Sequence, residues 1–421
     1  MRLNIIIIAL SLLVSSLALS GLDNQPELKK QSDAHQMFLL RNALNRHPRS
    51  SDFYAGEVAC AFNDTPTCEE RFKTVLAVEP KSNTAKQIHH ILAYAAMREG
   101  RYGRSLREMD ALLAIDPNDS DAKSTRPFIE ALSHFPDQAV LQRSGTDKVT
   151  VQMEDGRLPL VINGKKAGYF IDTGANLSTL SESDALLFGM EIYEVKSTGA
   201  DINGNRVLFR IARAKSLALG SVELRNVAFL VVAKDAQPFV DMEPGQRGLI
   251  GLPVLLELGS VTWNREGAFE ADLSPSGRNL SAANICFDDL NLITEARFEG
   301  HAYPFVLDTG AVTSDLWPRF AGVARDLMRT SSTHESHTVT GVGGGQKFES
   351  TSIPKVVLEL GGKSVVLQPA HIVETQQGTT SKWFYGNLGV DLLRQAETVT
   401  INFKAMTLKL ESPAGVPMRG K

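Results

Sequence analysis

One short stretch of this chain occurs twice, and it decides the fold. Residues 168–175 read GYFIDTGA and residues 304–311 read PFVLDTGA. In each copy an apolar run, typical of a buried β-strand, ends directly before Asp172 or Asp308. A given four-residue string arises by chance in fewer than about one in a hundred chains of this size. Two copies of DTGA in matching surroundings therefore indicate a duplicated domain.

The sequence on either side of the two copies also repeats in the same order. A turn glycine precedes each aspartate at the same distance, Gly164 in the first half and Gly300 in the second. Glycine-rich hairpin signals follow at residues 198–204 and 340–345. Short β-branched runs separated by Gly, Asn and Asp are typical of strands joined by hairpins, so both halves are expected to be β.

Each half ends with a similar apolar segment that contains a glycine. Residues 249–255 read LIGLPVL, and residues 388–393 read LGVDLL. Asn387 is a departure, because it leaves Leu388 as the single apolar residue before Gly389. We expect this change to weaken the packing of the second half without affecting its chemistry.

These motifs resemble the retropepsin-like aspartic proteases, once in each half, over about residues 149–410. Retroviral members of that family build their site from two identical chains, whereas pepsin-like enzymes carry both lobes in one polypeptide. This chain resembles the pepsin-like arrangement built from retropepsin-like lobes. The resemblance implies a bilobal all-β fold with pseudo-twofold symmetry and an aspartic-type endopeptidase activity that needs no cofactor or metal.

The resemblance assigns catalysis to Asp172 and Asp308. One carboxylate takes a proton from a water molecule while the neighbouring carboxylic acid protonates the carbonyl oxygen of the peptide. Two such groups held about 3 Å apart cannot both ionise, so the pair retains one shared proton.

Six neighbouring residues are expected to support the pair: Thr173, Gly174, Ala175, Thr309, Gly310 and Ala311. The glycines permit a tight turn that brings backbone N–H groups to the carboxylates. By the resemblance, the threonines reach across to the opposite lobe. The alanines stand where pepsin-like enzymes usually have a hydroxyl that stabilises the charged aspartate, so we expect a working pH that is mildly acidic or neutral.

The two glycine-rich hairpins are interpreted as flaps that close over an extended polypeptide substrate, which would pair with them as an added strand. The candidate flap residues are Gly199, Asp201, Gly204, Gly341, Gly343 and Gly344. The second hairpin superficially looks like a phosphate-binding loop, but no Gly-Lys-Ser/Thr follows it. His334, Glu335 and His337 lack the spacing of a helical zinc motif.

Residues 31–135 are rich in Leu, Ala, Arg and Glu, with apolar residues at helical spacing, such as Leu106, Met109 and Leu113. A stretch around Ala93, Gly100 and Pro117 resembles a tetratricopeptide repeat. Such repeats often bind a partner protein, so we expect either a recruiting surface or a helical cap that packs on the next domain. A third alternative is that the helical region inhibits the protease until it is displaced.

The complete prediction is an α+β multidomain chain. Its expected parts are a signal peptide (1–20), a helical repeat-like domain (21–138), two protease lobes (139–275 and 276–412) and a flexible tail (413–421). Arg2 followed by an apolar run predicts export to the periplasm or the medium, with cleavage after Ser20. The alternative is an uncleaved membrane anchor, although the run is shorter than the roughly 20 residues of a spanning helix.

Charge balance and cysteine content limit the kinds of partner and the class of protein that fit this chain. Acidic and basic residues nearly balance, 48 against 44, which argues against nucleic acid as a partner. The chain has three cysteines, of which Cys60 and Cys68 are near enough in sequence to pair, whereas Cys286 reads as a buried apolar residue. The competing hypothesis to a protease is an inactive protein of the same fold that binds peptides uncut and uses its helical repeats to recruit partners.

Overall fold

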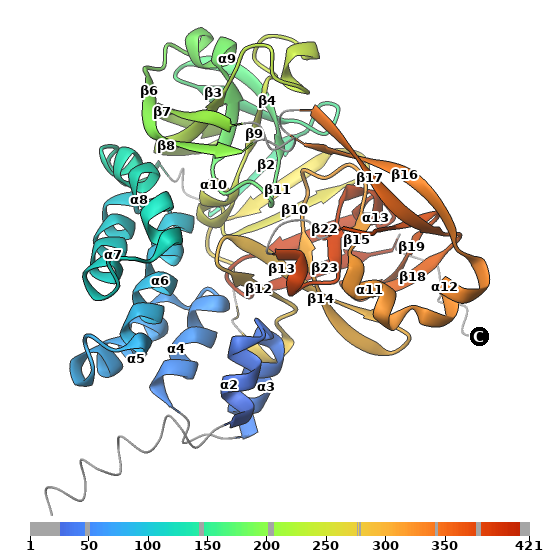
Figure 1. Cartoon of the computed structure of the whole chain (residues 1–421). Helices are drawn as coiled ribbons and strands as arrows, with labels where there is room; N and C mark the ends of the chain where they lie inside the picture. The colour runs from blue at the N-terminus through green and yellow to red at the C-terminus, as the bar shows by residue number, and fades with distance from the viewer. Residues whose placement is uncertain are drawn as a thin grey trace, which may run out of the picture.

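The computed structural model describes residues 26–46, 51–142, 147–200, 206–275, 277, 279–341, 344–375 and 380–412. A row of helices lies along one side of a β-rich body in these residues (Figure 1). The expected signal peptide and the expected tail both lie outside the described residues.

The N-terminal part of the described chain is helical, as the sequence predicts. Its helices are α2 (Pro26–Asp33), α3 (Met37–Arg46), α4 (Asp52–Ala61), α5 (Thr65–Val78), α6 (Asn83–Arg98), α7 (Tyr102–Ile115) and α8 (Ser120–Ser133). Helix α4 packs on α5, and α7 packs on both α6 and α8. The side chains of Ser51, Asp64, Ser82 and Asp119 cap helix N-termini by accepting backbone N–H bonds.

A disulfide between Cys60 and Cys68 joins α4 to α5. The third cysteine, Cys286, is free and buried, as the sequence indicates. Within the described residues, no helix combines the length and the apolar character needed to cross a membrane.

The first β half forms a sheet in the order β1-β8-β5-β9-β4-β3-β7-β6. Its strands are β1 (Ala139–Gln142), β3 (Leu158–Ile162), β4 (Lys165–Ile171), β5 (Ser178–Ser181), β6 (Ile192–Ala200), β7 (Arg206–Leu219), β8 (Val222–Val232) and β9 (Gly248–Ile250). The predicted hairpin between β3 and β4 is confirmed: Asn163 and Gly164 both have positive φ, which a two-residue type I′ turn requires. Helices α9 (Glu182–Leu187) and α10 (Leu252–Glu257) follow β5 and β9.

The second β half repeats the central pairings of the first. Its strands are β12 (Ile285–Asp288), β13 (Asn291–Phe298), β14 (His301–Leu307), β15 (Asp315–Leu316), β16 (Thr333–Gly341), β17 (Gly344–Ile353), β18 (Val356–Leu360), β19 (Lys363–Leu367), β20 (Ala370–Val373) and β21 (Gly386–Leu388). Helices α11 (Pro318–Val323), α12 (Arg325–Ser331) and α13 (Val390–Leu393) lie between or after them. Strand β14 runs parallel to β21, as β4 runs parallel to β9, and β15 and β5 each pair antiparallel on the other side.

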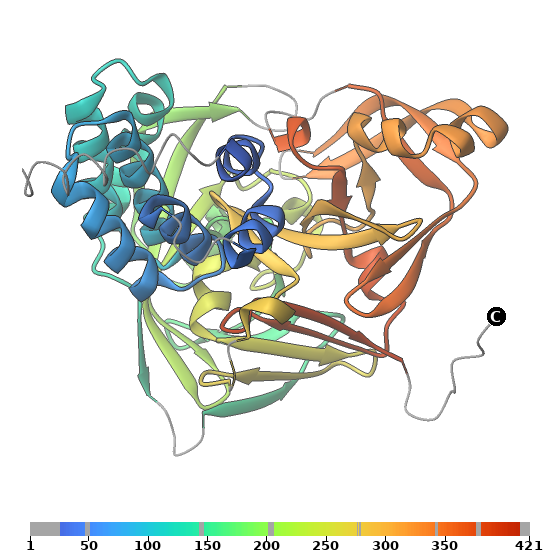
Figure 2. The ribbon, with the colours of Figure 1, turned by 90° about the horizontal axis from the view of Figure 1, so that it is seen from below.

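A third sheet joins the two halves. It contains β2 (Lys148–Gln152), β10 (Ser260–Asn264), β11 (Ala268–Asp272), β22 (Thr398–Asn402) and β23 (Thr407–Glu411), in the order β2-β11-β10-β22-β23. The junction is the antiparallel pair β10–β22, in which Val261 faces Ile401 in the register. Figure 2 shows the red strands of the second half beside the yellow strands of the first. Backbone hydrogen bonds between β10 and β22 therefore join the two halves in one sheet.

Buried and partly buried polar contacts hold the helical region against the β body. The Arg41 guanidinium donates to the carbonyls of Leu280 and Ala283, at 3.0 and 2.6 Å, in the segment that connects the two halves. The Asn63 amide donates to the Phe403 carbonyl at 2.8 Å. These contacts agree with the expectation of a cap that packs on the next domain.

We predict that Arg41→Met destabilises the chain by on the order of 2 kcal/mol, because it leaves the buried Ala283 carbonyl and the partly buried Leu280 carbonyl without their donor. The matched control is Arg46→Met in the same helix, since Arg46 is exposed and pairs with Glu27 at the surface. That change should cost less than about 1 kcal/mol. Thermal unfolding of both variants tests the difference, and equal losses would contradict a docking role for Arg41.

Candidate active site

Paired strands place the two aspartates at the same point in each half. The Asp172 backbone N–H donates to the Ile250 carbonyl at 2.9 Å, directly after β4 leaves its pairing with β9. The Asp308 N–H donates to the Leu388 carbonyl at 3.0 Å after β14 leaves β21. Each aspartate is thus fixed by a parallel strand that arrives from much later in the sequence.

The turn after each aspartate wraps its backbone around the carboxyl group. In the first half, the N–H groups of Gly174 and Ala175 donate to Asp172 Oδ1 at 2.8 and 3.1 Å. In the second half, the corresponding N–H groups donate to Asp308 Oδ1 at 2.9 and 3.1 Å. In both carboxyl groups the Oδ1 atom is therefore held by two backbone N–H groups of the turn.

The structure brings the two carboxyl groups together. A Cβ atom added to Gly174 would lie 2.6 Å from Asp308 Oδ1, and one added to Gly310 would meet the carboxyl group of Asp172. Each aspartate thus lies over the glycine of the opposite half. The glycines are required here for space, because any side chain would displace the partner carboxyl group.

Two buried threonines connect the loops that carry the aspartates. The Thr173 hydroxyl donates to the Leu307 carbonyl at 2.7 Å and accepts the Thr309 N–H at 3.0 Å. Reciprocally, the Thr309 hydroxyl donates to the Ile171 carbonyl and accepts the Thr173 N–H, both at 3.0 Å. Four hydrogen bonds between the halves therefore fix the separation of the carboxyl groups.

Burial and like charge act strongly on Asp172, whose exposed fraction is 9%. Desolvation by burial, followed by the charge of Asp308, raises the pKa of Asp172 to about 8, against the opposing effect of the Gly174 N–H. The first carboxyl group therefore keeps its proton into the neutral range. This behaviour is the expected one for two carboxyl groups that share a site.

Asn387 makes the two halves unequal. Its side-chain amide donates to Asp308 Oδ2 at 3.0 Å, whereas the corresponding position beside β4 is Leu249, which offers no donor. The sequence-based expectation for Asn387 was wrong, because the residue acts on the carboxyl group rather than only on packing. A signal was present in the sequence, namely an amide in place of an apolar residue, but only the β14–β21 register reveals its target.

The candidate flap residues are described only in part. Gly199 pairs with Val207 near the end of β6–β7, and Gly341 pairs with Gly344 at the end of β16–β17. Asp201, Gly204 and Gly343 lie outside the described residues. The β16–β17 hairpin extends from the second half toward the first (Figure 1). Both predicted hairpins are present, and their role as flaps stays a prediction.

The other polar clusters considered from the sequence have ordinary partners. His334 contacts Glu374 at 2.7 Å, and Glu335 contacts His371 at 3.1 Å, in pairs along the β16–β17 hairpin and β20. Among the residues that the structure describes, no group of three or more His, Cys, Asp or Glu is arranged to hold a metal ion.

Comparisons with known proteins give matches to aspartic proteases. A family model described as aspartyl protease matches residues 158–254, a segment that contains Asp172 but not Asp308. No curated protein matches the sequence. Among solved structures, a retropepsin-like aspartic protease from Rickettsia conorii is similar, with 17% identity, a TM-score of 0.21, and coverage of 32% of this chain and 91% of that one.

We predict that Asp172→Asn raises the thermal stability of the protein at pH 8 more than at pH 4. Because the folded Asp172 has a raised pKa, the native state holds a proton that the unfolded chain releases above about pH 4, so native stability falls as the pH rises toward 8. The substitution removes that loss. Unfolding temperatures measured across this range, with the exposed Asp235→Asn as control, test the prediction, and parallel curves for variant and wild type would contradict it.

Proposed function

We propose that this protein is an aspartic endopeptidase that hydrolyses extended polypeptides with a water molecule activated between Asp172 and Asp308. The observation that carries the proposal is the approach of one carboxyl group from each half over the opposite glycine. The match of residues 158–254 to aspartyl proteases supports the reaction class. The equivalent strand pairings around each aspartate support two lobes with pseudo-twofold symmetry.

The two aspartates are proposed to have different roles. Asp172 is the more buried, and its raised pKa suits the group that holds the shared proton. The amide of Asn387 donates to Asp308, which favours the charged form of that carboxyl group. Asp308 is therefore the base that accepts a proton from water, and Asp172 is the acid that protonates the carbonyl oxygen.

The proton balance of this reaction closes without a cofactor. The water oxygen bonds to the peptide carbon, its proton passes to Asp308, and the Asp172 proton passes to the carbonyl oxygen. In the second step the C–N bond breaks, Asp308 gives its proton to the amine, and Asp172 recovers a proton from the diol. The pair returns to its starting state with a single shared proton.

Other features of the chain fit an extended substrate and an exported protein. The hairpins β6–β7 and β16–β17 are proposed as flaps that pair with substrate backbone. The Cys60–Cys68 disulfide, together with the apolar N-terminal run, supports export to an oxidising compartment. The helical region is proposed to be a fixed cap, since Arg41 and Asn63 bind it to the connecting segment and to the second half.

We predict that Asp172→Asn and Asp308→Asn each lower hydrolysis of a diverse peptide library by about a thousandfold or more. The exposed Asp235→Asn serves as the control and should cleave like the wild type. A pepstatin-like inhibitor offers a second, independent readout. Binding of peptides by the folded wild type with no cleavage at any pH from 4 to 8 would contradict the proposal and would favour an inactive peptide-binding protein.

We predict that Asn387→Leu, which copies Leu249 of the first half, lowers peptide hydrolysis by about tenfold in a folded protein. The variant loses the amide that donates to Asp308 Oδ2. A loss of that size is the typical contribution of one hydrogen bond to a charged group. A folded variant that cleaves like the wild type would show that Asn387 does not set the roles of the two aspartates.

A further inference from the structure

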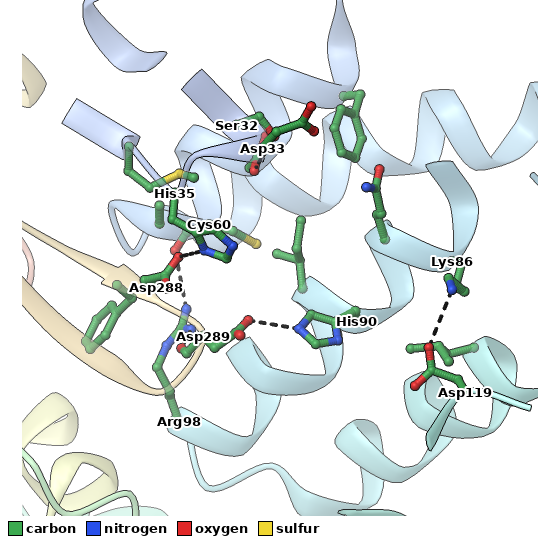
Figure 3. A pocket seen from close by; sticks show the side chains of 18 residues that line it. Ser32, Asp33, His35, Cys60, Lys86, His90, Arg98, Asp119, Asp288 and Asp289 are labelled. Carbon is green, nitrogen blue, oxygen red and sulfur yellow. Dashed lines mark hydrogen bonds and ion pairs between the residues drawn. The ribbon is translucent and has the colours of Figure 1, made fainter. Parts of the chain in front are cut away.

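A cavity of about 420 Å³ lies between the helical region and the turn that joins β12 to β13 (Figure 3). Helices α2, α4 and α6 supply one wall, and Asp288 and Asp289 of the turn supply the other. None of the residues proposed for catalysis lines it. Its volume falls in the range of pockets that hold small organic ligands.

The positively charged groups in this cavity already have partners. His35 contacts Asp288 at 2.8 Å, and His90 contacts Asp289 at 3.0 Å, as the dashed lines in Figure 3 indicate. Arg98 donates to the backbone carbonyls of Asp289 and Cys60. These contacts fix the acidic turn against the helices.

The remaining cation is held by carboxylates at another part of the wall. The Lys86 ammonium group lies 3.0 Å from Asp116 and 3.4 Å from Asp119. Each cation that lines the cavity, namely Lys86, Arg98 and the two histidines, therefore has an anionic or carbonyl partner. None of them is left to bind a negatively charged ligand.

Glu57 is the group whose bonding is incomplete. Its Oε1 atom accepts the Ser32 hydroxyl at 2.9 Å, but its Oε2 atom is buried and has no hydrogen-bond partner among the described residues. A buried carboxylate oxygen without a donor is costly, so it indicates a missing partner. Asp33 and Asp288 line the same cavity and add to its negative potential.

We propose that this cavity is a binding site for a small organic cation with a primary ammonium group, which donates to Glu57 Oε2. The ligand class follows from the chemistry of the wall, where the unfilled position is a buried carboxylate oxygen and the cations that line the cavity already have partners. A lysine side chain of a partner peptide and a free alkylamine share this chemistry. None of the residues that line the site belongs to the two turns that carry Asp172 and Asp308, so the site does not depend on the proposed proteolytic activity.

The state of Glu57 makes this binding dependent on pH. Burial raises the pKa of Glu57 to about 7, with the Ser32 hydrogen bond opposing the rise, the charge of Asp288 adding to it and His35 lowering it. Burial lowers the pKa of His90, but the hydrogen bond to Asp289 together with the charges of Asp289, Asp119 and Asp288 outweighs burial and raises it. The pKa of His35 is raised in the same way by its hydrogen bond to Asp288 and the charges of Asp288, Asp289 and Glu57. As the pH falls, Glu57 becomes neutral and both histidines keep their charge. The other charged groups that face the cavity are Lys86, Arg98, Asp33, Asp119 and Asp289.

Calorimetric titration of the purified full chain with n-butylamine tests the site, with 1-butanol and butyrate as neutral and anionic probes of similar size. We expect butylamine to bind at pH 8 and to bind about tenfold or more weakly at pH 5.5. Near pH 7 its binding should release a proton, which titrations in buffers of different ionisation enthalpy measure. The two other probes should bind at least tenfold more weakly. Equal binding of butylamine and 1-butanol, binding that strengthens toward pH 5.5, or no binding at pH 8 would overturn the proposal.

Paired variants separate the site from a general effect of charge. Glu57→Gln should weaken butylamine binding at least tenfold, whereas Glu70→Gln, an exposed carboxylate on the neighbouring helix α5, should leave it unchanged. Similar losses in both variants would overturn the assignment to Glu57. If Glu57→Gln does not fold, the pH dependence and proton release of the wild type still decide the outcome. Peptide hydrolysis by the same samples reports separately on the proposed protease.

Discussion

The reciprocal hydrogen bonds of Thr173 and Thr309 are the constraint on which the site depends. Each hydroxyl donates to a strand-end carbonyl of the opposite half and accepts the opposite threonine N–H, so neither loop can move alone. Because the glycines that follow have no side chains, the loops approach until each carboxyl group lies over the other turn. Like charges at that separation cannot both persist, and the pair keeps a proton. The chemistry thus follows from how the backbones are held.

The junction sheet explains why the two halves can hold such a close arrangement. Strands β10 and β22 pair along their whole length, so backbone hydrogen bonds join the two halves. These bonds add to the threonine contacts beside Asp172 and Asp308. The helical region adds a third set of contacts, through Arg41 to the connecting segment and through Arg98 to the β12–β13 turn. Buried cations in these positions satisfy backbone carbonyls, which gives the docking a defined geometry rather than a general apolar contact.

Duplication does not produce two identical groups in this chain. Asp172 and Asp308 have matching backbone bonds, yet only Asp308 accepts a side-chain amide. Asn387 pairs with Val306 and donates to Asp308, whereas Leu249 takes the corresponding place opposite Phe170. The additional amide donor distinguishes the Asp308 carboxyl group from that of Asp172, because hydrogen bonds to a charged acceptor are about twice as strong as neutral ones. A one-chain arrangement allows such a difference between the halves, whereas two identical chains would carry the same residue twice.

The sequence by itself determined the features that depend on local patterns. The apolar run before Asp172, the Asn163–Gly164 turn and the helical spacing of residues 31–135 predicted strands, a hairpin and helices that the structure contains, because neighbouring residues decide these elements. Only the tertiary structure decided that Asn387 reaches Asp308 and that Glu57 faces a cavity closed by Asp288. Those contacts join segments far apart in the chain, so they depend on strand register and domain packing, which no local pattern of residues encodes.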